Sequence, residues 1–362
     1  MSLTQQKEDS FYQLLQLGPH QMKALIKSKP KGQRGKYILN MIVRNILIVG
    51  FALFFVGGAN VIFGSNNTSV AIAYFCILLQ SRYVNYGYKF RDLLVNLGIM
   101  SLIFAIDNQI SPNLPPLLAL VANLIFISII VFMTCHNPRL GNVAVYVDSY
   151  LFTTFMSPST NVHDFDLRVI EIIIGFVICA YSFYKHHHKH NSDVQFVDTL
   201  KTFDWKSDVT QWQLKVILGI SIIIFIGQSL NIPRNFWMAI AALSILLPFG
   251  DYSKAKRVFE RIGGVIVGCI LFMILFYLLP PAYSSLIGPI GGFFIGFSTT
   301  YHWNSVFNCF GSLALAAAIY GPKISIELRV FNNVLGCIAA LVFVIFYTCV
   351  LTMLFKNKET NA

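Results

Sequence analysis

The stretch LLALVANLIFISIIVFMT, Leu117–Thr134, runs for 18 residues without a charged side chain. A membrane-spanning helix needs about 20 predominantly apolar residues, so this stretch is nearly long enough by itself. The rest of the chain is similar, because 56% of its 362 residues are hydrophobic and 12% are charged. A soluble domain carries about 25% charged residues, and a disordered chain is far less apolar. The sequence therefore predicts an all-α polytopic membrane protein.

Eleven further apolar stretches lie on either side of a polar segment in the middle of the chain. The twelve expected spans are Leu39–Phe63, Thr68–Gln80, Asp92–Ile106, Leu117–Thr134, Val143–Met156, Leu167–Phe183, Gln213–Leu230, Phe236–Pro248, Ile262–Leu279, Ser285–Thr299, Val306–Tyr320 and Arg329–Phe355. We expect a cytoplasmic basic N-terminal segment (1–37), a first six-helix repeat (38–184), a cytoplasmic linker (185–212), a second six-helix repeat (213–355) and a cytoplasmic tail (356–362).

The distribution of basic residues predicts the orientation of these spans. If the N-terminus lies in the cytoplasm and the spans alternate, 23 of the 27 Lys and Arg residues fall on the cytoplasmic side. This agrees with the positive-inside rule. Topology and anionic headgroups then account for the net charge of +11, and no nucleic-acid partner is expected. We expect a multi-pass protein of the cell membrane, without a secretory signal peptide and with both termini in the cytoplasm.

The two halves of the chain resemble each other. The stretch Asn67–Leu79 (NTSVAIAYFCILL) aligns with Asn235–Leu247 (NFWMAIAALSILL) at an offset of 168, with seven of 13 positions identical. The motif Leu-Arg-Val, followed by a glycine, begins at Leu167 and again at Leu328. Six spans per half make the repeats parallel. The second span is short in both halves, and paired short spans are typical of a substrate site in transporters.

A segment of the second half carries a family resemblance. Its characteristic residues are Asn235-Phe-Trp237, Pro248-Phe-Gly250, Arg257-Val-Phe-Glu-Arg261-Ile-Gly263-Gly264 and Gly268. This pattern resembles the fusaric-acid-resistance-like (FUSC) family, also described as an integral membrane-bound transporter domain. A degenerate copy in the first half keeps Arg82, Lys89, Arg91 and Gly98. The resemblance covers residues 38–355 and implies an efflux or transport protein, with aromatic acid exporters and malate-type anion channels among its relatives. The short linker departs from members that carry a large soluble domain between the halves.

Glu171 is the first candidate for a functional residue, because ionisable groups are costly within a membrane. On a helix it shares a face with Gly175 and Cys179, and small residues mark tightly packed membrane helices. The matching face of the second half holds Asn332, Gly336 and Ala340, with Arg329 in the place of Arg168. The carboxylate is therefore present in one half only and is a candidate proton carrier. The simpler interpretation is an Arg168–Glu171 ion pair near the outer interface.

Other polar residues are weaker candidates for the same pathway. Asp148 lies in the fifth span and could instead hydrogen-bond a neighbouring helix, while Asp107 is expected to be a solvated residue at a helix end. Asn67 and Asn235, at the matching starts of the two short spans, are expected to line the pathway. Asn332 either lines it or joins helices. Trp237 either stacks on an aromatic substrate or belongs to an interfacial aromatic belt.

Four arginines are expected at equivalent cytoplasmic mouths: Arg82, Arg91, Arg257 and Arg261. Such a ring would concentrate organic anions, although positive-inside topology by itself requires basic loops. The tract Lys185–His190 is interpreted as a solvated loop rather than a metal site. No metal or other cofactor is expected.

We expect a transporter that exports small organic, including aromatic, anions by proton-coupled alternating access. A passive organic-anion channel and a membrane subunit of a larger efflux assembly remain alternatives. No nucleotide-binding or hydrolytic motif occurs in the chain, so an enzyme is not expected. The expected partners are the lipid bilayer and the anion, and a homo-oligomer is left open.

Overall fold

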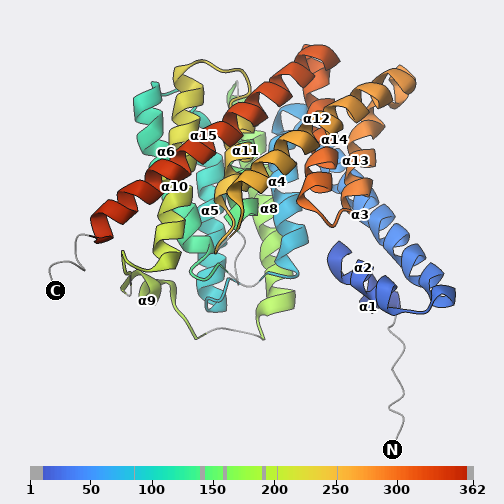
Figure 1. Cartoon of the computed structure of the whole chain (residues 1–362), viewed down its shortest axis with the longest axis horizontal. Helices are drawn as coiled ribbons and strands as arrows, with labels where there is room; N and C mark the ends of the chain where they lie inside the picture. The colour runs from blue at the N-terminus through green and yellow to red at the C-terminus, as the bar shows by residue number, and fades with distance from the viewer. Residues whose placement is uncertain are drawn as a thin grey trace, which may run out of the picture. The chain divides into compact units, whose positions relative to one another are not determined.

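The computed structural model describes residues 11–84, 86–138, 143–157, 161–189, 193–201, 203–250 and 252–356. It is all-helical, with 84% helix and no strand in these ranges (Figure 1). Residues 357–362 of the expected tail and His190 of the histidine tract lie outside the described residues.

The helices follow one another along the whole chain. In order they are α1 (Phe11–Leu15), α2 (Pro19–Ser28), η1 (Lys31–Gln33), α3 (Arg34–Phe63), η2 (Ser65–Asn67), α4 (Thr68–Ser81), α5 (Phe90–Ile110), α6 (Pro116–Thr134), α7 (Val143–Leu151), η3 (Phe152–Met156), α8 (Val162–His187), α9 (Phe196–Lys201), α10 (Asp208–Ser229), α11 (Phe236–Leu246), α12 (Lys254–Leu278), η4 (Pro281–Leu286), α13 (Ile287–Ile295), α14 (Tyr301–Tyr320) and α15 (Pro322–Lys356).

Seven helices of the described chain are long and apolar enough to cross a membrane. They are Lys31–Phe63, Phe90–Ile110, Pro116–Thr134, Val162–His187, Asp208–Ser229, Lys254–Leu278 and Pro322–Leu354. The other five expected spans coincide with α4, α7 and η3, α11, α13 and α14. These do not meet the same criteria of length and hydropathy. A multi-pass helical membrane protein is therefore supported, while the count of twelve spans and the two repeats remain predictions.

The chain divides into two compact units. Unit 1 contains residues 1–54 and 259–330, and unit 2 contains residues 55–258 and 331–362. The boundaries fall within α3, α12 and α15, so each of these helices contributes to both units. The expected division into two sequential repeats with a linker between them remains a prediction.

Unit 2 is a bundle in which short helices lie among long ones. The short helix α4 packs against α7 and α8, and α11 packs against α10 and α7. Nine of the eleven residues of α11 are buried, as are eight of the 14 residues of α4. Both expected short spans are thus shielded by protein, which explains how helices too short for the bilayer can remain within a membrane protein.

Local sequence signals fix several helix ends in unit 2. Gly64 precedes η2 with φ of 83°, a conformation that favours glycine. At the start of α8, the Asn161 side chain accepts a hydrogen bond from the Asp164 backbone N–H at 2.8 Å. Pro116 occupies the first turn of α6, where its missing N–H costs no intrahelical bond.

Unit 1 is built around α12, α13 and α14. A Cβ atom at Gly264 would lie 2.7 Å from the His302 carbonyl oxygen, and one at Gly268 would overlap the Val306 carbonyl oxygen. These two glycines therefore allow the backbones of α12 and α14 to approach closely. A buried cluster including Phe272, Ile287 and Phe310 joins all three helices.

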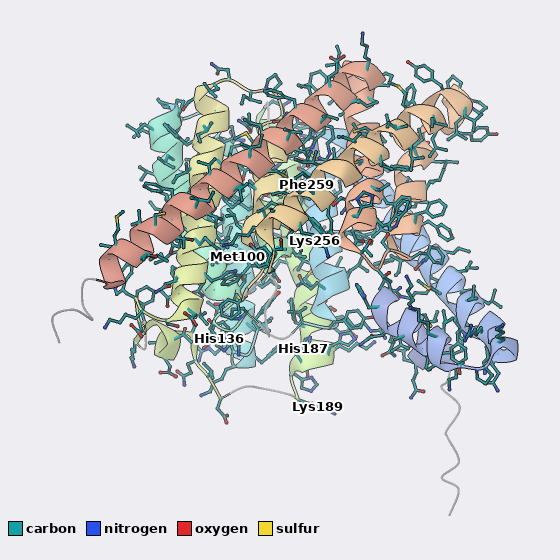
Figure 2. All side chains as sticks on the ribbon, viewed as in Figure 1. Met100, His136, His187, Lys189, Lys256 and Phe259 are labelled. Atoms are coloured by element: carbon teal, nitrogen blue, oxygen red, sulfur yellow. The ribbon has the colours of Figure 1, made fainter. Side chains whose placement is uncertain are left out.

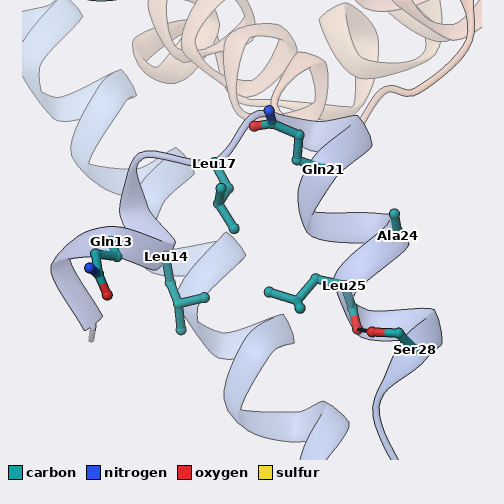
Figure 3. Close-up of a pocket in the computed structure, with 7 residues that line it drawn as sticks. All are labelled: Gln13, Leu14, Leu17, Gln21, Ala24, Leu25 and Ser28. Atoms are coloured by element: carbon teal, nitrogen blue, oxygen red, sulfur yellow. Dashed lines mark hydrogen bonds between the residues drawn. The ribbon is translucent and has the colours of Figure 1, made fainter. Parts of the chain in front are cut away.

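The N-terminal helices α1 and α2 also belong to unit 1. Leu14 and Met22 are buried with Tyr37 and Met41 of α3. Leu14 and Leu25 also line a pocket of about 510 Å³ between α1 and α2 (Figure 3). This part of the expected basic N-terminal segment is therefore folded onto α3 by its apolar residues.

The linker folds back onto unit 2. The Lys89 backbone N–H donates to the Val194 carbonyl at 2.9 Å, and the Phe196 N–H donates to Asp92 Oδ2 at 2.8 Å. The Tyr88 ring lies between those of His136 and Phe196, with centroids 4.6 Å and 5.9 Å away. The expected cytoplasmic linker thus contains a segment, at Val194 and Phe196, that is docked on the start of α5.

Candidate functional site

Glu171 lies on α8 and is only 6% exposed. Both of its carboxylate oxygens are buried and receive no hydrogen bond from the described residues. Burying a carboxylate without hydrogen-bond donors is expensive, and ionisable groups within membrane helices are candidates for function for that reason. The geometry therefore retains Glu171 as the leading site residue.

The face of α8 that carries Glu171 packs against α4. A Cβ atom at Gly175 would overlap the Tyr74 ring, so the glycine allows close contact. One turn further on, the Cys179 thiol donates to the Tyr74 carbonyl oxygen at 3.7 Å. The Tyr74 hydroxyl in turn donates to Ser101 Oγ of α5 at 2.6 Å. The expected small-residue face is thus an interface with the short helix α4.

Arg168 is completely buried one turn before Glu171. It donates hydrogen bonds to Asn67 Oδ1 (3.2 Å) and to the carbonyl oxygens of Asn66 (3.3 Å), Thr153 (2.8 Å) and Ser157 (2.6 Å). Its guanidinium therefore holds the start of α4 and the π-helical segment η3 against α8. This arrangement favours a positioning role for Arg168. The guanidinium also interacts electrostatically with Glu171 without donating a hydrogen bond to it, so the ion-pair interpretation stays open.

The second half uses a similar contact with different polar groups. A Cβ atom at Gly336 of α15 would overlap the Met238 carbonyl oxygen of α11. The Asn332 side chain, one turn earlier, donates to the Pro233 carbonyl at 3.1 Å. Asn235 begins α11 and packs closely against Gly227 of α10. Asn67 occupies the corresponding position in the first half, where its amide donates to the Phe63 and Asp164 carbonyls.

Asp148 and Trp237 lie on other helices of unit 2. Asp148 is partly buried on α7 and close enough to interact electrostatically with Cys76 of α4. Trp237 is 1% exposed, and the Arg234 guanidinium lies 5.3 Å from its ring centroid. Such burial favours a packed aromatic over an interfacial belt for Trp237.

The expected cytoplasmic arginines do not share one environment. Arg82 and Arg257 are partly buried and Arg91 is exposed, all three in unit 2, with Arg257 Nε donating to the Ser244 carbonyl at 2.6 Å. Arg261 belongs to unit 1 and is 5% exposed. Arg329 is also in unit 1, 4% exposed and within hydrogen-bonding reach of the Cys309 thiol. The anion-concentrating ring remains a prediction.

Asp107 was expected to be solvated, and that expectation is wrong. Its side chain is fully buried, and Oδ1 accepts a hydrogen bond from the Ser111 hydroxyl at 2.6 Å. Thr154 of η3 lies 3.4 Å from Oδ2. The i, i+4 spacing of Asp107 and Ser111 is a sequence signal for this pair, whereas the contribution of η3 comes from another part of the chain.

The histidines are held by helix carbonyls and aromatic rings. His187, at the end of α8 (Figure 2), lies 2.6 Å from the Ser81 carbonyl oxygen, and His186 lies 2.8 Å from that of Ser182. No group of three metal-binding side chains occurs among the described residues. Outside the spans, burial lowers the pKa of His136 and favours its neutral form.

Seven apolar helices and a buried carboxylate on one of them define a multi-pass membrane protein with a candidate ion site. Residues 222–343 match the family model described as fusaric acid resistance protein-like, and this match supports a membrane protein of that family. The matched segment contains most of the predicted motif, from Asn235 to Gly268. The match covers less than half of the chain; together with the apolar helices it suggests a membrane transporter, and such a protein would lie in a lipid bilayer. No curated protein and no solved structure matched the chain.

Proposed function

We propose that this protein carries small organic anions across the membrane by proton-coupled alternating access. The observation that carries the proposal is the carboxyl group of Glu171, buried without a hydrogen-bond donor among the described residues. A carboxyl group in such a place costs less to keep when it is protonated, so a change in its surroundings can release or bind a proton. Glu171 is accordingly assigned as the proton carrier.

The surroundings of Glu171 support a moving part. Its helix touches the short helix α4 through Gly175, and α4 is held at its start by Arg168. Short spans at corresponding positions of two repeats are typical of transporter substrate sites. A shift of α4 against α8 would change the exposure of Glu171, which is what proton coupling requires.

The anionic class of the substrate rests on charge. Arg261 and Arg329 are buried in unit 1, and guanidinium groups bind carboxylates strongly. The described part of unit 1 contains only two acidic residues, Glu260 and Glu327. An anion is therefore favoured over a cation. Outward movement, a location in the cell membrane and cytoplasmic termini are proposed on the sequence pattern and its family resemblance.

Purified protein in liposomes tests this proposal. Labelled benzoate and malate are loaded, and their efflux is followed with an imposed pH gradient or with a membrane potential alone. We expect efflux that responds to the pH gradient, is lost in Glu171→Gln and is retained in Asp166→Asn. Asp166 is a matched control because it is an exposed carboxylate on the same helix.

Three other results would contradict the proposal in different ways. Efflux that follows voltage alone and survives Glu171→Gln would identify a passive anion channel. Equal loss of efflux in both variants would remove the special role of Glu171. Absence of flux for every acid, from protein that remains folded and monodisperse, would favour a subunit of a larger assembly.

A further inference from the structure

A polar pocket in unit 1 has no part in the proposed transport function. It has a volume of about 340 Å³ and lies among the start of α2, the middle of α3, the end of α13 and the first turn of α14. The side chains that give it chemical character are those of His20, Arg44, Asn45, Ser298 and Asn304. Among the described residues that line it, none is acidic.

The positive character of the pocket comes from two elements. Arg44 brings a permanent charge from α3, and His20 lies in the first turn of α2. Pro19 has no N–H, and the Gly18 N–H is bonded to Gln21 Oε1 at 3.0 Å. This leaves the N–H groups of His20 and Gln21 to supply the partial positive charge of the helix start. Lys23 fixes α2 here, because its ammonium group donates to Thr299 Oγ1 at 3.0 Å. The pocket is therefore suited to an anionic oxygen.

Asn45 adds a second and independent requirement for a ligand of this pocket. It is 1% exposed, and its Oδ1 receives no hydrogen bond from the described residues. Its Nδ2 donates to the Phe293 carbonyl at 3.4 Å, which orients the amide. A side chain at Gly296 would overlap this amide, so the glycine leaves room for it. A ligand would therefore offer a hydrogen-bond donor to Oδ1 in addition to an anionic group.

Exposed apolar side chains on the helices that line the pocket indicate where such a ligand comes from. Ile46 and Leu47 follow Asn45 on α3 and are 56% and 55% exposed. Phe294 of α13 is 42% exposed. Exposed apolar residues on a candidate membrane span are positioned to contact acyl chains.

We propose that this pocket binds the headgroup of a glycerophospholipid whose phosphodiester lies next to a hydroxyl or ammonium donor. Arg44 and the first turn of α2 hold the phosphodiester, and Asn45 accepts the hydrogen bond from the donor. Phosphatidylglycerol and phosphatidylethanolamine carry such a donor. Phosphatidylcholine has the same phosphodiester, but its quaternary ammonium has no N–H group.

Native mass spectrometry of the delipidated full-length protein tests this site. Phosphatidylglycerol, phosphatidylethanolamine, phosphatidylcholine and soluble glycerol 3-phosphate are titrated separately. We expect the two donor-bearing lipids to bind about tenfold more tightly than phosphatidylcholine. Arg44→Gln should weaken them by at least about tenfold. Lys27→Gln makes the same charge change at an exposed position of α2 outside the pocket, and it should leave their binding unchanged.

Several outcomes would overturn the proposal. Equal binding of phosphatidylcholine would remove the role of the donor, and equal weakening by Arg44→Gln and Lys27→Gln would reduce the effect to general charge. Glycerol 3-phosphate binding as tightly as phosphatidylglycerol would assign the pocket to a soluble phosphate. If Arg44→Gln does not yield monodisperse protein, Asn304→Leu tests the same pocket from α14. Unchanged lipid binding in that variant would contradict the proposal.

Discussion

The contact of α4 with α8 and that of α11 with α15 use one packing device with different chemistry. In each, a glycine of the long helix lies against the short one, Gly175 on Tyr74 and Gly336 on Met238. One turn before the glycine, however, the first contact has the carboxylate of Glu171 and the second has the amide of Asn332. The amide is hydrogen-bonded to Pro233, whereas the carboxylate receives no bond from the described residues.

This difference separates structural from functional requirements. Close approach of a long and a short helix is needed in both places, and glycine supplies it in both. A buried ionisable group is costly within a membrane protein, and the groups that are kept there commonly mark functional sites. If Glu171 is the proton carrier, as proposed, proton binding is confined to the first half of the chain and the mechanism is asymmetric.

The largest loss of stability is expected when Arg168, which anchors the contact of α4 with α8, is replaced. Arg168→Leu would leave the buried amide carbonyl of Asn67 without its guanidinium donor and weaken the bonding of the Thr153 and Ser157 carbonyls. Unpaired buried carbonyls cost about 1–3 kcal/mol each, so we expect a loss of roughly 3 kcal/mol or more. Thermal unfolding in detergent measures it. Asn332→Leu, which removes the bond to Pro233, should cost clearly less; equal losses would show that the two contacts are anchored alike.

Substitution of the two contact glycines should cause the next largest loss of stability. Gly336→Ala would drive a Cβ atom into the backbone of α11, and overpacking of this kind costs about 1–3 kcal/mol. Gly175→Ala would overlap Cγ of the buried Tyr74 ring, an atom close to the backbone that cannot swing away, so it should cost about as much as Gly336→Ala. Gly98→Ala is the control, since its Cβ would make an ordinary contact of 3.7 Å with Phe176. Unfolding temperatures that rank these three variants differently would argue against the packing described.

Cys179→Ala converts one position of the first contact into its second-half counterpart, Ala340. It removes the weak bond from the thiol to the Tyr74 carbonyl at 3.7 Å. We expect a loss of about 1 kcal/mol, measured by the same unfolding experiment. A loss of stability as large as that of Arg168→Leu would contradict this account, because one weak hydrogen bond from the thiol could not explain it.

The smallest change in stability is expected for Glu171→Gln. The two side chains have nearly the same shape, and no described donor bonds either carboxylate oxygen. Stability should therefore stay within about 1 kcal/mol. Severe destabilisation would reveal a structural carboxylate and would weaken its assignment as a proton carrier.

Much of the fold was predictable from hydropathy and length. Every expected span coincides with a helix, and the two short spans, at Thr68 and Phe236, were recognised as short. The number of membrane crossings was not predictable in the same way. Hydropathy identifies apolar segments, but whether neighbouring helices shield a short one depends on contacts between distant parts of the chain, as for α11 between α7 and α10.

The site was predictable in part, for a related reason. The position of Glu171 on the small-residue face of its helix followed from spacing alone. The hydrogen bonds of Arg168 could not be predicted in this way. Three of its acceptors are backbone carbonyls, which every residue carries and which therefore leave no signal in the sequence. Asp107 was misinterpreted because its position at the end of an apolar stretch resembles a solvated helix end. Its burial depends partly on η3, whose π-helical turn has no clear sequence signal.

Infrared difference spectroscopy of the protein in lipid tests the central claim most directly. If Glu171 is the proton-binding group, the spectrum near neutral pH contains a protonated-carboxyl band that disappears in Glu171→Gln and remains in Asp166→Asn. An identical spectrum in the wild type and in Glu171→Gln would contradict the account, because the buried carboxyl group would then hold no proton to exchange.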